Sequence, residues 1–341
     1  MTNKPYNLVV YIGRFQPFHN AHLNNIKQAA ELSDNVLVII GSSYLPRTYK
    51  NPFTAEERKD MIVNSLDDEL LDSVSIEFNT DSMYNDTAWA MRVQDIVDGY
   101  VEFGDKVALF GYSKDESSYY LKMFPQWETI EATPSEILSA TDIRELYFKE
   151  DLNFNFINNV LPEPVIDFLE DFSRTKEYQQ IIRERRFVEN YKKQFAGMPY
   201  PPTFVTSDAV VFCQGHVLMI GRKAEPGKGL MALPGGFLNA ATDKSVLDAA
   251  IRELKEETKI KVPIPVLKGC VKSEKVFDAI GRSARGRTIT HAFNIVLPDL
   301  ELPKVKGSDD ALWARWIPLA DIKSEHCFDD HYDIIMHFVG G

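Results

Sequence analysis

The sequence predicts an α/β protein made of two unlike domains. The chain has 341 residues, more than twice the length of a typical domain of about 150 residues. Its first half alternates short β-branched runs with amphipathic stretches, and its second half becomes rich in strand patterns after a cluster of prolines. With 44% hydrophobic and 26% charged residues, the composition is that of a globular protein and excludes a disordered chain.

The first half predicts a parallel sheet. Short apolar runs that alternate with helix patterns form βαβ units, and such sheets bind ligands beyond the carboxyl ends of their strands. Thr54-Ala-Glu-Glu57 has the sequence of a helix capping box. The expected strands are Leu8–Ile12, Val36–Ile40, Val74–Phe78, Val107–Phe110 and Glu128–Ala132. The expected helices are His22–Leu32, Thr54–Leu66, Asn85–Tyr100 and Ser117–Phe124.

The second half predicts a different fold. One more apolar helix opens at Leu161-Pro-Glu-Pro164, and Ser173–Gln194 is charged enough to be a solvated connecting helix. Prolines between positions 199 and 202 end that helix. The elements expected after it are the strands Val205–Cys213, Val217–Arg222, Ala292–Leu297 and Leu312–Ile317, and the helix Ser245–Thr258. We therefore expect domains at 1–172 and 203–341, joined by a helix and linker at 173–202.

The balance of charge limits the partners. The chain has 38 Lys+Arg against 50 Asp+Glu, a net charge of −12. This acidity argues against a nucleic-acid partner, because binding to nucleic acid depends on cations that neutralise phosphates. The acidic net charge does not exclude small phosphorylated ligands, which need only a local basic pocket.

From the sequence pattern we expect neither a membrane-spanning segment nor a secretory signal. No apolar run approaches the ~20 residues that span a bilayer, so we expect no membrane association. The first residues run into a strand pattern and do not read as a secretory signal. The three cysteines (Cys213, Cys270 and Cys327) form no Cys-x-x-Cys pair, so we expect a cytoplasmic protein without disulfides or a thiolate zinc site.

Chemically active residue types follow the first expected strand. Gly13 permits a tight turn, and Arg14 and Phe15 follow it directly. His19 and His22 are three apart, so at a helix start they share one face beside free backbone N–H groups and the positive end of the helix dipole. Two histidines and an arginine there can stabilise charge on a transferring phosphoryl group. The alternatives are two incidental histidines, or a metal site that lacks a third ligand at a familiar spacing.

A second group of candidates lies later in this half. In Ser139-Ala-Thr-Asp-Ile-Arg144, Ser139 or Thr141 can cap a helix whose free amides face phosphates, and Arg144 adds charge. Alone the hexamer is weak, because Ser and Thr before a helix are usually only caps. Trp89 offers a platform for a flat ring, with plain helix packing as the alternative. The other candidate binding residues are Arg47, Asn85 and Lys114.

The string Gly13-Arg-Phe-Gln-Pro-Phe-His-Asn-Ala-His22 resembles the His-x-Gly-His signature of the nucleotidyltransferase superfamily, in the form found in archaeal-type nicotinamide mononucleotide (NMN) adenylyltransferases. Ala21 stands where the signature has glycine. The resemblance implies a Rossmann-like domain in which the NMN phosphate attacks the α-phosphorus of ATP, giving NAD and pyrophosphate. It also implies that His19, His22 and Arg144, with Mg²⁺, stabilise the transition state. The substrate-binding residues implied are Gly13, Arg14, Phe15, Ser139 and Thr141.

The helix expected at Ser245–Thr258 carries a second chemistry. Glu253, Glu256 and Glu257 lie at i, i+3 and i+4, so their carboxylates gather on one side of the helix. Three carboxylates repel one another unless a cation lies among them. Mg²⁺, with Mn²⁺ as an alternative, prefers all-oxygen sites shared with phosphates. The other explanation is a solvated acidic face.

With Gly235 and Gly236 upstream, this helix resembles the Nudix box, which implies an α/β/α domain with a mixed sheet. The resemblance makes Glu253, Glu256 and Glu257 the metal ligands and places substrate at Gly235 and Gly236. Arg252 can hold one of the carboxylates in place. In three respects the sequence departs from the box: Lys259 stands at a glycine position, the spacing from Gly236 to Arg252 is longer, and Asp243 is the nearest substitute for the first glutamate.

A later loop narrows the substrate. Arg282, Arg285 and Arg287 form a basic cluster suited to a diphosphate, with a solvated basic loop as the alternative. The segment 283–292 and the pair Asp309-Asp310 resemble ADP-ribose pyrophosphatases, which implies hydrolysis of ADP-ribose to AMP and ribose 5-phosphate. Glu325 or a glutamate of the box is the candidate general base.

Both resemblances occur in this order in the bifunctional NMN adenylyltransferase/Nudix hydrolases. They imply ATP, NMN, NAD and ADP-ribose as ligands, and they leave a homo-oligomer open. One alternative is another substrate pair, in which the first domain uses a different phosphate acceptor or the second hydrolyses NADH or nucleoside triphosphates. Another is a Nudix domain that senses ADP-ribose without cleaving it. Regulators of that kind carry a DNA-binding winged helix, and no basic recognition helix is expected after residue 320.

Overall fold

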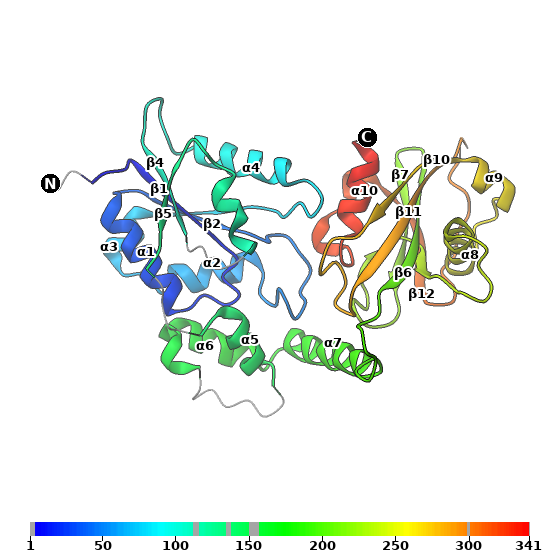
Figure 1. Cartoon of the computed structure of the whole chain (residues 1–341), viewed down its shortest axis with the longest axis horizontal. Coiled ribbons are helices and arrows are strands. Elements are labelled where there is room, and N and C mark those ends of the chain that lie inside the picture. Colours follow the sequence, from blue (N-terminus) through cyan, green and yellow to red (C-terminus); the bar gives the residue numbers. More distant parts are fainter. Residues whose placement is uncertain (1–3, 112–115, 134–137, 150–156, 299–300, 341) are drawn as a thin grey trace. The chain divides into compact units, whose positions relative to one another are not determined.

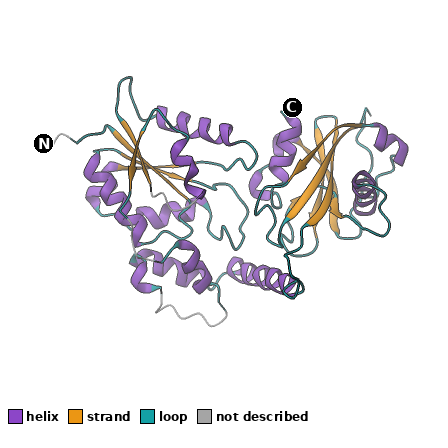
Figure 2. Cartoon of the chain, in the orientation of Figure 1, coloured by secondary structure: helices purple, strands orange, loops and turns teal. Residues whose placement is uncertain are grey.

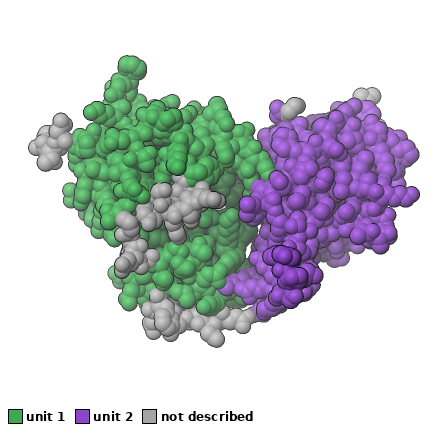
Figure 3. All heavy atoms as spheres, viewed as in Figure 1, with its two compact units in different colours: residues 1–182 green, residues 183–341 purple. Residues whose placement is uncertain are grey.

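The computed structural model describes residues 4–111, 116–133, 138–149, 157–298 and 301–340. The chain divides into two compact units, residues 1–182 and 183–341 (Figure 3). Lys114, one of the candidate binding residues, lies outside the described part of the chain.

Unit 1 is built on a five-stranded parallel sheet with strand order β3-β2-β1-β4-β5 (Figure 1). The sequence prediction of a parallel sheet is confirmed, and β1 lies at its centre because it pairs with both β2 and β4. The strands are β1 (Leu8–Gly13), β2 (Val36–Ile40), β3 (Val74–Phe78), β4 (Val107–Gly111) and β5 (Glu128–Glu131).

Both faces of this sheet are covered by helices, as the buried residues show. On β1, Val9 and Tyr11 pack with α1, α2, α5 and α6, whereas Val10 and Ile12 pack with α4 on the opposite face. This alternation follows from the two-residue period of a strand. The helices are α1 (Asn20–Leu32), α2 (Ala55–Val63), α3 (Asp68–Ser73), α4 (Asp86–Asp98), α5 (Ala140–Tyr147) and α6 (Glu163–Phe172), with a 3₁₀ turn η3 (Asn158–Val160) (Figure 2).

One expected helix of unit 1 has a different form. The helix expected over Ser117–Phe124 is present as the 3₁₀ helix η1 (Glu116–Lys122) and not as an α-helix. A 3₁₀ helix has three residues per turn, so it aligns positions that are three apart. Leu121 and Phe124 have that spacing, and both are buried in the core on the α4 face.

A long charged helix, α7 (Lys176–Lys193), follows α6, as the sequence predicts for Ser173–Gln194. Its first turns belong to unit 1, where Tyr178 and Ile181 join the core and the Tyr178 hydroxyl donates to the carbonyl of Tyr147 at 3.0 Å. Its later turns, from Arg183, belong to unit 2. Among the described residues, no helix is both long and apolar enough to cross a membrane.

Unit 2 contains a seven-stranded mixed sheet. The strand order is β10-β11-β6-β7-β12, in which β11 runs parallel to β6 and the other neighbours are antiparallel. The short strands β8 and β9 pair with β7 and β6. The strands are β6 (Phe204–Cys213), β7 (His216–Arg222), β8 (Met231–Ala232), β9 (Gly235–Phe237), β10 (Val271–Phe277), β11 (Thr288–Val296) and β12 (Ala311–Pro318).

Helices lie on both sides of this sheet, which confirms the predicted three-layer arrangement (Figure 1). On one side Ile251 and Leu254 of α8 pack against Val211 and Phe293. On the other, Phe338 of α10 lies 6.1 Å from the ring of Phe277, measured between centroids. The elements are α8 (Val246–Thr258), α9 (Ile264–Gly269), α10 (His331–Val339) and the 3₁₀ turns η4 (Leu319–Asp321) and η5 (Ser324–His326).

The end of α8 explains one departure from the box motif. Lys259 is the C-cap residue of α8 and takes the left-handed conformation, with φ +50°. Glycine adopts this conformation without the steric cost that a side chain carries, so the motif's glycine would suit the position. The exposed Lys259 therefore places a strained residue at the end of the acidic helix.

We predict that Lys259→Gly stabilises unit 2. Removing the left-handed strain should raise the free energy of unfolding by about 0.5–1 kcal/mol. Urea denaturation of the full chain, followed by hydrogen exchange of unit 2 peptides, measures the change. Lys261→Gly is the matched control, since Lys261 is also exposed but has no positive φ, and it should not stabilise. An equal gain in both variants would contradict the strain at Lys259.

Candidate active sites

Two histidines lie at the junction of β1 and α1. His19 is the N-cap residue of α1, and its ring stacks on that of His22 with 3.6 Å between centroids. Burial lowers the pKa of His19 to about 4, and burial followed by the charge of His19 lowers the pKa of His22 well below its ordinary value. The Nδ1 atoms of both rings are buried and have no hydrogen-bond partner among the described residues. The pair is therefore neutral near pH 7 and retains unused hydrogen-bonding capacity.

The turn before these histidines is rigid. Phe15 takes a positive φ of 52°, and a Cβ at Gly13 would stand 2.7 Å from the Phe15 ring, so only glycine fits at that place. The buried Gln16 holds the turn by two hydrogen bonds to the backbone of Phe53, one donated at 2.8 Å and one accepted at 3.0 Å. The ring of Phe15 also contacts His22, with 4.9 Å between centroids. The fold thus fixes the histidines before any ligand binds.

Buried arginines surround this turn. Arg144 of α5 donates to the carbonyl of Gln16 at 2.6 Å and to the hydroxyl of Thr141 at 3.1 Å. Burial and the charge of Arg14 lower the pKa of Arg144 to about 10, and its Nε has no partner in the described structure. Arg58 is 1% exposed and donates to the carbonyls of Arg14, Gly41 and Ser42. Arg144 therefore keeps a donor for a ligand, whereas the guanidinium of Arg58 donates to backbone carbonyls.

Lys50 is a candidate that sequence reasoning missed. Desolvation lowers the pKa of Lys50, and the positive charges of Arg14 and Arg144 act in the same direction, against that of Asp81. These interactions place Lys50 near both arginines although it lies in a different loop. Its position just before Asn51 and the Thr54 capping box was the available signal, but a lysine in a polar loop is usually solvated.

The other predicted residues of unit 1 have varied surroundings. Arg47 is paired with Glu57 through two contacts, of 2.6 and 2.7 Å, so it supports the capping box of α2. Asn85 is the N-cap residue of α4, and Trp89 packs against Tyr120 and Phe124. Ser139 caps α5 in a capping box with Asp142, and this cap leaves Thr141 free to bind Arg144.

In unit 2, Arg252 binds three carboxylates. It makes two bonds to Asp243, of 2.9 and 2.8 Å, and donates to Glu253 at 2.8 Å and Glu256 at 3.0 Å. Hydrogen bonding from Arg252 holds the pKa of Asp243 below its ordinary value. Asp243 thus binds the arginine of the box, and the expectation that Arg252 holds a carboxylate is confirmed. Whether Asp243 also reaches a metal stays an expectation.

A second set of carboxylates lies deeper. Glu257 is 5% exposed, and its carboxylate accepts a hydrogen bond from the backbone N–H of Gly235 at 3.0 Å. Burial raises the pKa of Glu257 to about 8 in spite of this bond, and the charges of Glu253 and Asp208 act in the same direction. A Cβ at Gly235 would stand 2.3 Å from Asp208, and one at Gly236 would stand 2.5 Å from Glu253. The two glycines therefore let the carboxylates approach the backbone closely.

The chemistry of these donors fits a divalent cation. Within the described ranges, no three His, Cys, Asp or Glu side chains are already arranged as a ligand set. However, Glu253, Glu257 and Asp208 are oxygen donors that lie near one another, and desolvation raises the pKa of both glutamates. A cation would supply the positive charge that keeps such carboxylates ionised. Asp208, on β6, was not predicted, because it is far from the box in the sequence.

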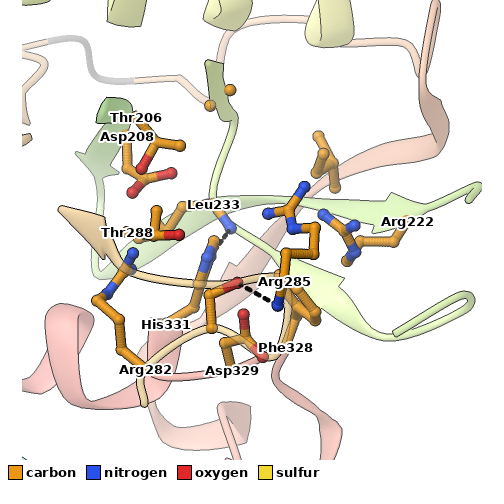
Figure 4. Close-up of a pocket in the computed structure, with 14 residues that line it drawn as sticks. Thr206, Asp208, Arg222, Leu233, Arg282, Arg285, Thr288, Phe328, Asp329 and His331 are labelled. Carbon is orange, nitrogen blue, oxygen red and sulfur yellow. Dashed lines mark hydrogen bonds between the residues drawn. The ribbon is translucent and has the colours of Figure 1, made fainter. Parts of the chain in front are cut away.

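A polar pocket lies beside the carboxylates (Figure 4). Arg222 and Arg285 both line it, and desolvation followed by the charge of Arg285 lowers the pKa of Arg222. Arg285 lies over the ring of Phe237, 4.8 Å from its centre, and its Nε is buried without a partner among the residues described. Desolvation and the charge of Asp330 raise the pKa of Asp329 to about 7, against the nearby arginines. Two neighbouring guanidinium groups, one of them with an unused donor, would suit an anionic ligand.

The three arginines that the sequence grouped have different partners, although Arg282 and Arg285 both line the pocket. The buried Arg282 makes a two-contact ion pair with Asp330, both at 2.8 Å. Arg285 faces the pocket, whereas Arg287 binds the carbonyl of Asp278 and is not among the pocket residues. The segment precedes β11 as an irregular loop, so adjacent arginines point to different neighbours.

Two further pocket residues were not predicted. His331, at the start of α10, accepts a hydrogen bond from the backbone N–H of Leu233 at its Nδ1, at 2.8 Å. The neutral ring therefore carries its proton on Nε2, and burial lowers the pKa of His331. Phe328 lies under the guanidinium of Arg222. The candidate base Glu325 lies on η5, 3.9 Å from His326, and is not among the pocket residues.

Comparison with known proteins defines the class first. Residues 10–146 match the cytidylyltransferase-like family and residues 203–338 match the NUDIX domain family, so the chain combines a nucleotidyltransferase-like domain with a Nudix domain. A nicotinamide/nicotinic acid mononucleotide adenylyltransferase of Acinetobacter baylyi is 40% identical over 183 residues, which are 53% of this chain and 94% of that protein.

A solved structure matches the whole chain. It is a bifunctional NMN adenylyltransferase/ADP-ribose pyrophosphatase from Francisella tularensis, complexed with AMP and a manganese ion. It is 36% identical, with 98% of this chain and 99% of that chain covered and a TM-score of 0.90. The chain belongs to the family of bifunctional NMN adenylyltransferase/ADP-ribose pyrophosphatases. The expected family and the order of its two domains are confirmed.

The buried histidine predicts a pH dependence of stability. The pKa of His19 is about 4 in the folded state and about 6.5 unfolded, so the unfolded state binds more protons between these values and stability falls as the pH drops. From pH 7 to pH 5 His19 should cost unit 1 about 2 kcal/mol. Urea denaturation at both pH values, followed by hydrogen exchange of unit 1 peptides, measures the loss.

Variants separate this effect from general acid sensitivity. His19→Asn should reduce the loss between pH 7 and pH 5. His326→Asn should leave it unchanged, because the His326 side chain is 58% exposed. A His19→Asn variant as pH-sensitive as the wild type would refute the assignment.

Proposed function

We propose that the chain catalyses two reactions in NAD metabolism. Unit 1 transfers the adenylyl group of ATP to NMN, giving NAD and pyrophosphate, and unit 2 hydrolyses ADP-ribose to AMP and ribose 5-phosphate. The observation that supports this most is the match along 98% of the chain to a bifunctional NMN adenylyltransferase/ADP-ribose pyrophosphatase. The free cysteines suit a reducing compartment, so we place both reactions in the cytoplasm.

In unit 1 the histidine pair and the surrounding cations suit adenylyl transfer. An oxygen of the NMN phosphate attacks the α-phosphorus of ATP, the new P–O bond forms, and the bond to the β-phosphate breaks to release pyrophosphate. His19 and His22 contact the phosphates through ring nitrogens, and Arg14, Lys50 and Arg144 offset the negative charge that grows on the phosphoryl oxygens. Mg²⁺ that accompanies ATP would add further positive charge.

The rigid turn supplies the geometry. Because Gly13, Phe15 and Gln16 are held by packing and by hydrogen bonds to Phe53, the histidines need not move to receive substrate. The amides at the start of α5, which begins at the Ser139 cap, suit the outer phosphates of ATP. Asn85 and Trp89 remain the proposed contacts of the nicotinamide, and Lys114 remains a proposed contact.

In unit 2 the carboxylates would hold the divalent ion and the arginines the diphosphate. Glu253, Glu256 and Glu257 are the proposed ligands, with Asp208 nearby, and the ion would make a bound water more acidic. Arg222 and Arg285 bind the diphosphate oxygens, whose negative charge relieves the repulsion between the two guanidinium groups. Gly235 and Gly236 leave room for the phosphates. The pKa of Asp329, about 7, suits a group that accepts a proton at neutral pH.

We predict that the two reactions can be removed one at a time. His19→Ala should abolish NAD formation from NMN and ATP and spare the release of AMP from ADP-ribose. Glu256→Gln should do the reverse, because it removes one of the carboxylate charges near the ion. Both assays are run on the full chain with Mg²⁺ and then with Mn²⁺.

The same assays test the proposed function. If the wild-type chain makes no NAD from NMN, the proposal for unit 1 fails. If it binds ADP-ribose with excess Mg²⁺ but releases no AMP, unit 2 is a sensor and not a hydrolase.

We also predict a role for Arg222 in substrate binding. Arg222→Ala should raise the KM for ADP-ribose by about tenfold, since a hydrogen bond to a charged group is worth about 1.5–3 kcal/mol. Arg315→Ala is the matched control: Arg315 is an exposed arginine over Trp313 on the neighbouring strand β12, and its loss should leave KM unchanged. Equal effects of the two substitutions would indicate a general loss of positive charge.

A further inference from the structure

The loop between β7 and β8 contacts two side chains that line the unit 2 pocket, Arg222 and Phe328. Arg222, at the end of β7, donates from Nε to the carbonyl oxygen of Pro226 at 2.9 Å. Its guanidinium lies 3.8 Å from the centre of the Phe328 ring, and both side chains line the pocket (Figure 4). Gly227 takes φ +74°, and a Cβ there would stand 2.3 Å from Phe328. Loop, arginine and ring therefore pack tightly, and the direction of Arg222 depends on the carbonyl of Pro226.

A buried glutamate carboxylate binds the backbone of this loop at Gly227. Glu184, on α7, is 7% exposed, and its carboxylate accepts a hydrogen bond from the backbone N–H of Gly227 at 3.1 Å. Burial raises the pKa of Glu184. The hydrogen bond from the Gly227 N–H and the charge of Arg222 lower this pKa and so offset part of the rise. Glu189 lies further along the same helix with its side chain 49% exposed. Burying a carboxylate costs free energy that an exposed one does not incur, so helix stability alone does not explain Glu184.

The two contacts act on a single peptide group. The carbonyl of Pro226 and the N–H of Gly227 belong to one peptide bond. This bond is planar and trans. In a trans peptide the C=O and the N–H point in opposite directions. Glu184 therefore holds the peptide plane by accepting from its N–H, and Arg222 donates to the carbonyl oxygen on the opposite edge of the same plane. Without Glu184 the plane can rotate, because Gly227 tolerates many backbone conformations.

We propose that Glu184 is a positioning residue of the hydrolase pocket. By holding the N–H of Gly227 it sets the carbonyl of Pro226, and that carbonyl aims the Arg222 guanidinium at the diphosphate of a nucleoside diphosphate sugar. The inference rests on the proposed function of unit 2, in which Arg222 binds the diphosphate. Glu184 itself touches no substrate atom, and its effect passes through Arg222.

Substitutions at Glu184 test this role. Glu184→Met keeps the length of the side chain and removes the acceptor, so it should raise the KM for ADP-ribose by about tenfold and change kcat by less than about twofold. Glu184→Gln keeps an acceptor oxygen and should raise KM by less than about threefold. Glu189→Ala is the control on the same helix and should change neither constant. NAD formation by the same samples reports the amount of active chain.

Two further measurements separate a positioning role from a structural one. In an Arg222→Ala chain, Glu184→Met should raise KM by less than about twofold more, because its effect passes through the missing side chain. Hydrogen exchange of the Gly227 amide should become faster in Glu184→Met and stay unchanged in Glu189→Ala. An unchanged KM, a full additional effect without Arg222, or unchanged exchange would each overturn the proposal.

The exchange measurement needs no turnover. If the wild-type chain released no AMP, the proposed function would fail, while the exchange of the Gly227 amide would still decide whether Glu184 holds the loop.

Discussion

Both sites depend on like charges that the fold holds close together and partly out of water. In unit 1 the positive charges are those of Arg14, Lys50 and Arg144. Arg14 and Arg144 lower the pKa of Lys50, and Arg14 also lowers the pKa of Arg144. In unit 2 the negative charges are those of Glu253, Glu257 and Asp208, and the charges of Glu253 and Asp208 raise the pKa of Glu257. Such groups repel one another, and backbone hydrogen bonds, such as that from Gly235 to Glu257, keep them in place. A ligand of opposite charge would relieve the repulsion, and for this reason we propose phosphates as the ligands in unit 1 and a divalent cation in unit 2.

Positive side chains have two distinct uses in this chain, and residue type does not distinguish them. Arg47, Arg58 and Arg282 are bound by Glu57, backbone carbonyls and Asp330, so they support the fold. Arg144 and Arg285 have a buried nitrogen without a partner in the described structure, and they retain capacity for a ligand. The difference lies in which oxygens the fold places nearby. It follows that a substitution such as Arg282→Ala would act first on stability, because it leaves Asp330 buried and unpaired.

Most of the architecture could be read from local patterns. The five parallel strands, the α4 and α8 helices and the connecting helix appear where their hydrophobic periods predicted them. The helix expected at Ser117–Phe124 is instead the 3₁₀ helix Glu116–Lys122, and the sequence pattern did not distinguish the two helix types because residues three apart share a face in both. Short elements such as β8, β9 and α9 were not predicted, since a few residues carry no detectable period. The strands β8 and β9 are stabilised by pairing with β7 and β6, and α9 by the burial of Leu267 in the core.

Motif spacing was enough to identify the histidine pair, the acidic helix and the family, because each motif acts within one turn or helix whose geometry is local. The composition of the pockets was not accessible in this way. Arg282 binds a carboxylate 48 positions away, and Lys50, Asp208, Arg222 and Asp329 reach their sites from separate loops and strands. The packing of strands, loops and helices against one another brings these residues together, and no short-range sequence period predicts that packing. The net charge of −12 likewise concealed two cation-lined sites, because a sum over the chain says nothing about where charges meet.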